Sequence, residues 1–223
     1  MRKAFTTLLA LMAFNLLFSQ NLLSERIFIE KKIPATLSEL DSIDTEGTPY
    51  FNPEFTKGSF TVGNTSYIAD MRYNIYIEMI EVQQDNTIVY LNPALKPKVT
   101  LGEKTFVYLN YPEKTMVYEL LASQKNAMLV KKHQVEFMPV KWNKNGSIKK
   151  YPAYRKIDPV IYFTPDQKEL FNVEKTTDFI SLLPGEKEPI KKFIQQEKLK
   201  KKNEADLIKL FNYVAGLTEA NQR

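Results

Sequence analysis

Residues 67–79 read YIADMRYNIYIEM and carry the clearest structural signal in the chain. The odd-numbered positions are apolar or aromatic, whereas the even-numbered positions include Asp70, Arg72, Asn74 and Glu78. Successive side chains of a β-strand point to opposite faces, so this alternation predicts a long strand with one buried and one polar face. The alternation loses its phase over residues 78–82, where we expect a β-bulge or a bend.

Segments of the same kind surround this strand from residue 48 to residue 174. β-Branched residues are dense there, and eleven of the twelve tyrosines lie between Tyr50 and Tyr162. Turn residues separate the segments at 63–64, 85–86, 102–103, 123–126 and 165–168. Strands joined by such short turns run antiparallel. We therefore predict a curled antiparallel β-meander, barrel-like or sandwich-like, as the body of the protein.

After residue 174 the spacing of apolar residues changes from two to about 3.6, which is typical of helices. We expect helices over residues 178–183 and 186–199, and a third that begins with Asn203 as its N-cap. The apolar stripe of the third helix consists of Leu207, Leu210, Phe211, Val214 and Leu217. These C-terminal helices, within residues 175–218, are predicted to pack on the β body, which gives the fold class α+β.

The first residues have the composition of a secretory signal peptide. Arg2 and Lys3 precede an apolar run over residues 4–18, and Ser19 is a small residue suited to cleavage. The run is shorter than the roughly 20 residues that a transmembrane helix needs. We predict residues 1–19 as the signal peptide and residues 20–47 as a lead-in outside the core, with no transmembrane segment in the mature chain.

Export affects both the charge and the compartment. Removal of residues 1–19 lowers Lys+Arg from 31 to 29 against 26 acids, so the net charge falls from +5 to +3. This mild excess gives no reason to expect a nucleic-acid partner. The chain has no cysteine, so it cannot be a lipoprotein, and we expect a soluble protein in the periplasm or outside the cell.

The scarcity of cysteine and histidine also excludes several chemistries. Without cysteine there is no thiolate zinc site, iron–sulfur cluster or cysteine nucleophile. His133 is the only histidine and lies in Lys-Lys-His-Gln on a presumed strand. We expect it to be a solvated surface side chain and not a catalytic base, and we expect no metal and no cofactor.

Several stretches are similar to a known family. These are YFNPEF at residues 50–55 leading to Gly58, RYNIY at 72–76 running on to 80–82, DF at 178–179, LLP at 182–184, IKKFI at 190–194, and Glu204 with residues 206–207. Together they resemble a family of secreted proteins of unknown function that is common in Bacteroidota bacteria. The resemblance implies a bacterial periplasmic or extracellular protein, with no established activity and no known site residues.

The polar row of the first stretch is one candidate site. If the sheet curls so that Arg72, Asn74 and Tyr76 point inward, they form a buried polar network, in which the arginine requires satisfied partners. A structural role is the leading interpretation, and a ligand pocket is the alternative. Asp70 and Glu78 on the same face are candidate carboxylates for glycoside hydrolysis, with an exposed polar face as the competing interpretation.

Residues 141–156 form the second candidate site. They contain no acid and carry aromatic and basic side chains, of which the binding candidates are Trp142, Lys149, Lys150, Tyr151, Tyr154 and Arg155. Cations beside flat rings suit anionic glycans, lipid head groups or peptidoglycan. The alternative is a solvated loop around Asn145-Gly146.

These observations favour a non-enzymatic binding or structural protein of the cell envelope or exterior. An envelope glycan or another envelope protein is the expected partner. The main alternative is a carboxylate-dependent hydrolase acting on envelope glycan or peptide. A third hypothesis is a peptide-recognition protein that offers an exposed strand edge.

Overall fold

A computed structural model describes residues 27–29, 44–85, 87–111, 113–173, 175–182, 187–200 and 203–220. The predicted signal peptide and most of the lead-in lie outside these residues. The strands are β1 (Phe28–Ile29), β2 (Thr56–Val62), β3 (Thr65–Asn74), β4 (Met79–Gln84), β5 (Thr87–Leu91), β6 (Lys98–Leu101), β7 (Lys104–Asn110), β8 (Thr115–Gln124), β9 (Ala127–Met138), β10 (Lys141–Trp142), β11 (Ile148–Lys150), β12 (Ala153–Thr164) and β13 (Phe171–Asn172). A short 3-10 helix, η2, spans Pro93–Leu95, and the α-helices are α3 (Thr176–Leu182), α4 (Lys187–Gln196) and α5 (Glu204–Ala220).

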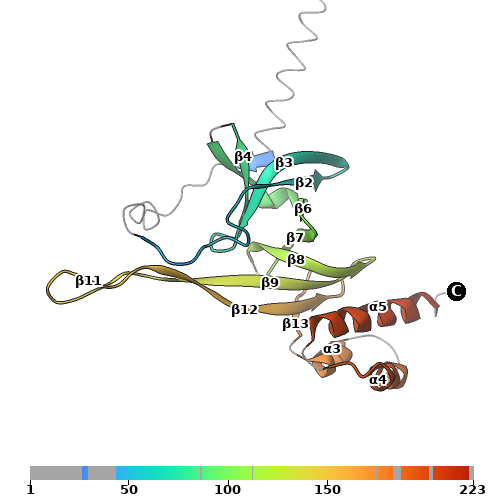
Figure 1. The fold of residues 1–223 in the computed structure, drawn as a ribbon. Helices are drawn as coiled ribbons and strands as arrows, with labels where there is room; N and C mark the ends of the chain where they lie inside the picture. Colours follow the sequence, from blue (N-terminus) through green and yellow to red (C-terminus); the bar gives the residue numbers. More distant parts are fainter. Residues whose placement is uncertain are drawn as a thin grey trace, which may run out of the picture.

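One antiparallel sheet forms the body (Figure 1). Its strand order is β1-β5-β4-β3-β2-β6-β7-β8-β9-β12-β13, and β10 pairs separately with β11. The antiparallel sheet predicted from the short turns is therefore confirmed, but the meander is not continuous, because β6 pairs with β2 and not with β5, the strand before it in the chain. The edge strands β1 and β13 do not pair with each other, so the sheet is not closed into a barrel, which corrects the barrel-like expectation. Closure requires the first and last strands to pair, and here the helices follow β13 instead.

The predicted hairpin turns occur where the chain can adopt a positive φ. Gly63 has φ 59° between β2 and β3, and Gly102 has φ 58° between β6 and β7. Asp85 and Lys125 adopt φ 52° and 50° in the turns that follow β4 and β8. Two-residue connections of this kind match the right-handed twist of the strands that they join.

The strand predicted over residues 67–79 is wrong in one respect: the chain reverses inside it. β3 ends at Asn74 and β4 begins at Met79, so Arg72 lies opposite Glu81 in a hairpin. The Asn74 side chain accepts a hydrogen bond from the Ile77 amide (3.2 Å), and Glu78 adopts φ 58° to complete the turn. This reversal takes the place of the expected bulge. The turn contains neither glycine nor proline, and apolar and polar residues keep alternating through it. The sequence therefore shows no turn signal at this point.

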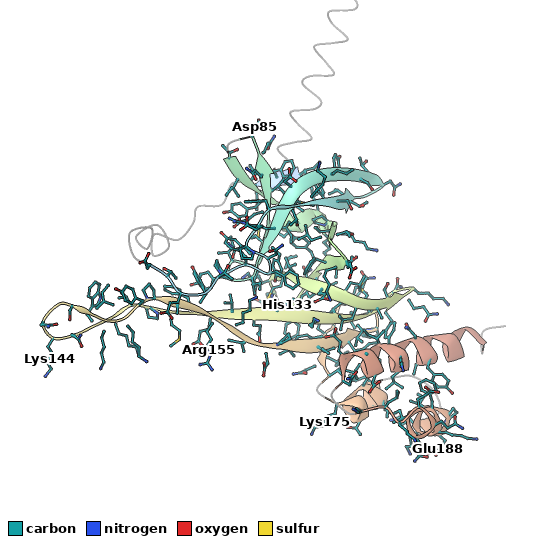
Figure 2. All side chains as sticks on the ribbon, in the orientation of Figure 1. Asp85, His133, Lys144, Arg155, Lys175 and Glu188 are labelled. Atoms are coloured by element: carbon teal, nitrogen blue, oxygen red, sulfur yellow. The ribbon has the colours of Figure 1, made fainter. Side chains whose placement is uncertain are left out.

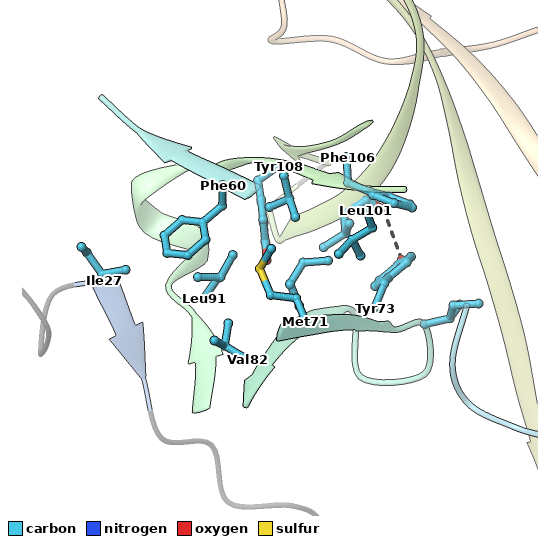
Figure 3. Packing of buried hydrophobic residues seen from close by; sticks show 13 residues of the cluster. Ile27, Phe60, Met71, Tyr73, Val82, Leu91, Leu101, Phe106 and Tyr108 are labelled. Carbon is cyan, nitrogen blue, oxygen red and sulfur yellow. Dashed lines mark hydrogen bonds between the residues drawn. The ribbon is translucent and has the colours of Figure 1, made fainter. Parts of the chain in front are cut away.

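The main core lies between the curled strands β2 to β8 (Figure 3). Its buried residues are Ile27, Phe60, Met71, Tyr73, Ile75, Ile80, Val82, Leu91, Val99, Leu101, Phe106, Tyr108 and Val117. Ile27 is 7% exposed and precedes β1, which pairs with β5. This part of the segment predicted as a lead-in therefore belongs to the core, which corrects that expectation.

A second core forms where the helices cover the far end of β9 and β12 (Figure 1). Leu129 and Phe163 from the sheet pack with residues of all three helices, among them Phe179, Ile190 and Leu210. The Asn203 side chain accepts a hydrogen bond from the Asp206 amide (3.1 Å), as predicted for an N-cap. Four residues of the predicted stripe are buried, namely Leu207, Leu210, Phe211 and Val214; the side chain of Leu217 lies outside the described part.

In the described part of the chain, no helix is both long enough and apolar enough to cross a lipid bilayer.

Candidate functional site

A long hairpin projects from the body where β9 and β12 continue beyond their neighbours (Figure 1). We call residues 134–157 the arm. β8 pairs with β9 only as far as Lys131, whereas β12 remains paired with β9 up to Met138. β10 and β11 pair beyond this point, and the tip is closed by hydrogen bonds from Gly146 N to Asn143 O (3.1 Å) and from Asn143 N to Ser147 O (2.8 Å). The arm is therefore an ordered hairpin and not an irregular loop.

The arm exposes both apolar and basic side chains. Trp142 is 54% exposed and Tyr151 52%, and Ile157 and Met138 are also exposed. The cations are Lys141, Lys144, Lys149, Lys150, Arg155 and Lys156, all of them exposed, and residues 137–157 contain no acid. Figure 2 shows Lys144 at the tip and Arg155 on the side away from the body. The structure thus brings most of the second candidate site together on one projecting element.

Tyr154, the remaining candidate of that group, lies at the root of the arm. Its ring contacts Phe137 (centroids 5.1 Å apart) and Tyr76 (5.5 Å). Burial, reinforced by the neighbouring Tyr76, raises the pKa of Tyr154. Tyr76 was predicted to share a row with Arg72 and Asn74, and the reversal after Asn74 carries it to the arm instead. This corrects the predicted site, since Tyr76 belongs with the arm.

A segment that precedes β2 fixes the root of the arm to the body. We call residues 46–55 the strap. Glu46 N donates to Pro152 O (3.0 Å), and Tyr154 N donates to Glu46 O (2.8 Å). Farther along the strap, Ile75 N donates to Pro49 O (2.8 Å) beside the turn that carries Tyr76. Gly47 adopts φ 74°, and a Cβ at this position would overlap the Tyr154 carbonyl oxygen. Glycine therefore allows the close contact between strap and arm.

Arg72 and Asn74 form the polar network expected for an inward-facing row. Arg72 Nε donates to Glu81 Oε2 (2.7 Å), and Asn74 Nδ2 donates to Glu81 Oε1 (2.8 Å). The other guanidinium nitrogens donate to Tyr50 Oη (2.7 Å) and Pro53 O (3.0 Å). Burial raises the pKa of Tyr50 to about 12, and the charge of Glu81 acts in the same direction. These contacts satisfy the arginine internally, so the geometry supports a scaffold role and not a ligand pocket.

The predicted carboxylate pair is not assembled. Asp70 is exposed on β3, whereas Glu78 lies in the turn beyond the end of that strand. Glu78 Oε1 lies 2.9 Å from Lys132 Nζ, and Glu78 Oε2 lies 3.2 Å from Lys114 Nζ. Because the chain reverses after Asn74, Asp70 and Glu78 do not share a strand face. The hydrolase hypothesis therefore loses the pair of residues on which it was based.

A buried ion cluster surrounds Glu119, which the sequence interpretation missed. Glu119 is 2% exposed and contacts the amines of Lys104 (2.6 Å) and Lys131 (3.1 Å), and the Nε2 atom of His133 (2.7 Å). Lys131 also contacts Glu204 of α5 (2.8 Å). A charged residue within the apolar sequence 116–122 was the available signal, since such a residue requires partners when it is buried.

The cluster corrects the expectation of a solvated histidine. The His133 side chain is 16% exposed, and its ring packs against Phe51 of the strap (centroids 4.9 Å apart). Burial alone would raise the pKa of Glu119, but hydrogen bonds from His133, Lys104 and Lys131 outweigh this effect and lower it to about 2. Burial likewise acts to lower the pKa of Lys131, and its two carboxylate partners raise it above the usual value. Glu119 is thus held ionised as a link between sheet, helix and strap.

Comparisons with protein-family models, curated proteins and solved structures find no match for this chain. The function must therefore be inferred from the chemistry of the arm itself. Among the residues that the structure describes, no three histidine, aspartate or glutamate side chains gather to hold a metal ion.

Proposed function

We propose that the protein is exported and acts as a non-enzymatic binding protein of the cell envelope or exterior, with the arm as its binding surface. One observation carries this proposal: Trp142 and Tyr151 are half exposed among six cations on an element that projects from the body. Large apolar side chains gathered on an exposed surface mark interaction sites more often than scattered ones do. Tryptophan, tyrosine and arginine are also the residues that most often dominate binding energy.

The charge of the arm indicates the nature of the partner. Residues 137–157 carry six cations and no acid, so the surface complements an anionic component. Acidic glycans, anionic lipid head groups and the acidic face of another envelope protein share this property. The composition of residues 1–19 supports an envelope or external location.

The root of the arm is fixed before a partner arrives. The strap donates to and accepts from the arm root at Pro152 and Tyr154, and the rings of Tyr76 and Phe137 pack on Tyr154. Preorganisation of this kind reduces the ordering cost that binding would otherwise incur. This preorganisation favours a binding element over a solvated loop without a binding role.

The test compares envelope binding by ring variants of the arm with that of a matched control. We expect W142S/Y151S to bind isolated envelope fractions at least about ten-fold more weakly than wild type, given the typical energies of interface aromatic residues. I88S removes an exposed side chain of similar accessibility (46%) on β5 and should bind like wild type. Equal binding by the arm variant and wild type would refute the proposal, and fractionation of cells tests the export.

A further inference from the structure

We propose, building on the function proposed above, that the arm binds the surface of an anionic lipid bilayer. Its apolar side chains would enter the interfacial region while its lysines and arginine contact the head groups. Anionic glycans and acidic proteins share the negative charge, so the apolar part of the arm must discriminate among them.

The exposed apolar residues of the arm include aliphatic side chains as well as rings. Met138 is 37% exposed and Ile157 45%. Flat rings can stack on sugars, but methionine and isoleucine offer no stacking surface, whereas a bilayer interface accepts all of these side chains. Tryptophan and tyrosine are the residues enriched at membrane interfaces. The combination of Trp142, Tyr151, Met138 and Ile157 therefore favours lipid over glycan.

The pairing of the strands places the aliphatic residues on the outer side of the arm. Ala153 lies opposite Met138, and Arg155 and Ile157 follow at alternate positions, so their side chains share one face. The other face carries Phe137 and Tyr154, whose rings pack with Tyr76 of the body. In Figure 2, Arg155 points away from the body. The exposed apolar groups and Arg155 thus lie on the face turned away from Tyr76, where Glu136 is the cross-strand partner of Arg155.

The distribution of charge at the tip adds an independent reason for an anionic surface. Lys141 and Lys150 are directly paired across β10 and β11. Like charges in opposed positions destabilise a strand pair, and a bound anion relieves this repulsion. A second copy of the chain would instead bring two cationic arms together. Charge complementarity therefore selects an anionic partner and disfavours self-association through the arm.

Trp142 is the only tryptophan, so its fluorescence reports directly on the arm. The experiment uses the chain from residue 20 onward, which retains every described residue and lacks the apolar segment 4–18. It is mixed with phosphatidylcholine vesicles that do or do not contain phosphatidylglycerol. We expect a blue shift, and quenching by brominated acyl chains, only with phosphatidylglycerol. Both effects should weaken as salt screens the head groups.

Charge variants measure the basic contribution. Each cation near an anionic bilayer strengthens binding about five-fold, so K149Q/K150Q should bind about thirty-fold more weakly than wild type. K57Q/K98Q removes two exposed cations from β2 and β6 and should retain wild-type affinity. Equal losses in both variants would overturn the proposal, because binding would then depend on net charge alone.

The outcomes separate this inference from the proposed function. Spectral shifts with a soluble anionic polysaccharide or an acidic protein, without brominated-lipid quenching, would overturn the lipid assignment and leave the binding function standing. If W142S/Y151S and K149Q/K150Q both bind the envelope as well as wild type does, the lipid assignment and the proposed function are both overturned. Quenching that depends on phosphatidylglycerol and on Lys149 and Lys150 would support both.

Discussion

Replacing Glu119 by Gln tests whether the buried ion cluster stabilises the fold through charge. The carboxylate is 2% exposed and is shared by Lys104, Lys131 and His133. Glutamine has nearly the same shape but no charge, so it removes the carboxylate that Lys104 contacts and leaves Lys131 with Glu204 alone. Removing one partner from a buried ion pair is expected to cost roughly 3–5 kcal/mol.

The pKa of Glu119 gives a second value for the same quantity. A fall from the ordinary value of 4.5 to about 2 corresponds to about 3 kcal/mol of stabilisation. Because the pKa is depressed in the folded state, this stabilisation is complete above pH 4.5 and is lost as the pH falls toward 2. The stabilisation is lost because Glu119 binds a proton at a higher pH in the unfolded chain than in the folded chain.

Urea unfolding over a pH series measures both effects. At neutral pH we expect E119Q to be about 3 kcal/mol less stable than wild type, and the difference should shrink below pH 4.5. E103Q, in the exposed turn between β6 and β7, serves as the control and should follow the wild-type curve. A difference that remains constant down to the lowest pH would refute the reasoning, because it would then arise from packing or hydrogen bonding and not from ionisation.

Two further substitutions test the scaffold that supports the arm. R72M leaves buried Glu81 without its guanidinium partner and should lower the free energy of unfolding by about 3–5 kcal/mol; unchanged stability with lost envelope binding would instead indicate a ligand site at Arg72. G47A places a Cβ against the Tyr154 carbonyl at φ 74° and should cost at least about 1–2 kcal/mol locally, with faster hydrogen exchange at the Tyr154 amide. Unchanged exchange would show that the strap does not fix the arm root.

The β-hairpins and the helices could be predicted because their signals are local, whereas the pairing of β6 with β2 was not predicted. Turns such as 63–64 and 102–103 contain glycine, which adopts the required positive φ at little cost. The helices follow from the spacing of apolar residues after residue 174 and from the N-cap at Asn203. Each of these features depends on neighbours within a few residues, so the sequence alone contains the necessary information.

The reversal after Asn74 could not be predicted in the same way. It depends on an asparagine side chain that accepts from the Ile77 amide and on Glu78 in a conformation that is unusual for its type. Both residues also fit the polar face of a continuous strand. The turn is also held by the distant strap, whose Pro49 carbonyl accepts a hydrogen bond from the Ile75 amide. The alternation of apolar and polar residues carries no information about a contact between such distant segments.

The candidate site also has one part that could be predicted from local sequence and one part that could not. The basic and aromatic character of residues 141–156 is a matter of composition and was visible in the sequence. The placement of Tyr76 beside Tyr154, and of His133 beside Glu119, depends on how separate hairpins meet. Long-range contacts of this kind are set by the tertiary fold, so they became visible only in the structure.

The distribution of charge gives the strongest physical argument that the arm serves an external partner. The whole chain has a net charge of +5, and the arm (residues 134–157), with six cations and one acid, Glu136, carries +5 by itself, so the remainder of the chain has no net charge. In the body, charges that turn inward are paired, as Arg72 is with Glu81 and Lys131 with Glu119. The arm concentrates like charges and contains no buried residue between positions 137 and 151, so its outer part gains little stability from its own packing. A free arm of this composition therefore carries unrelieved repulsion, which contact with an anionic surface would remove.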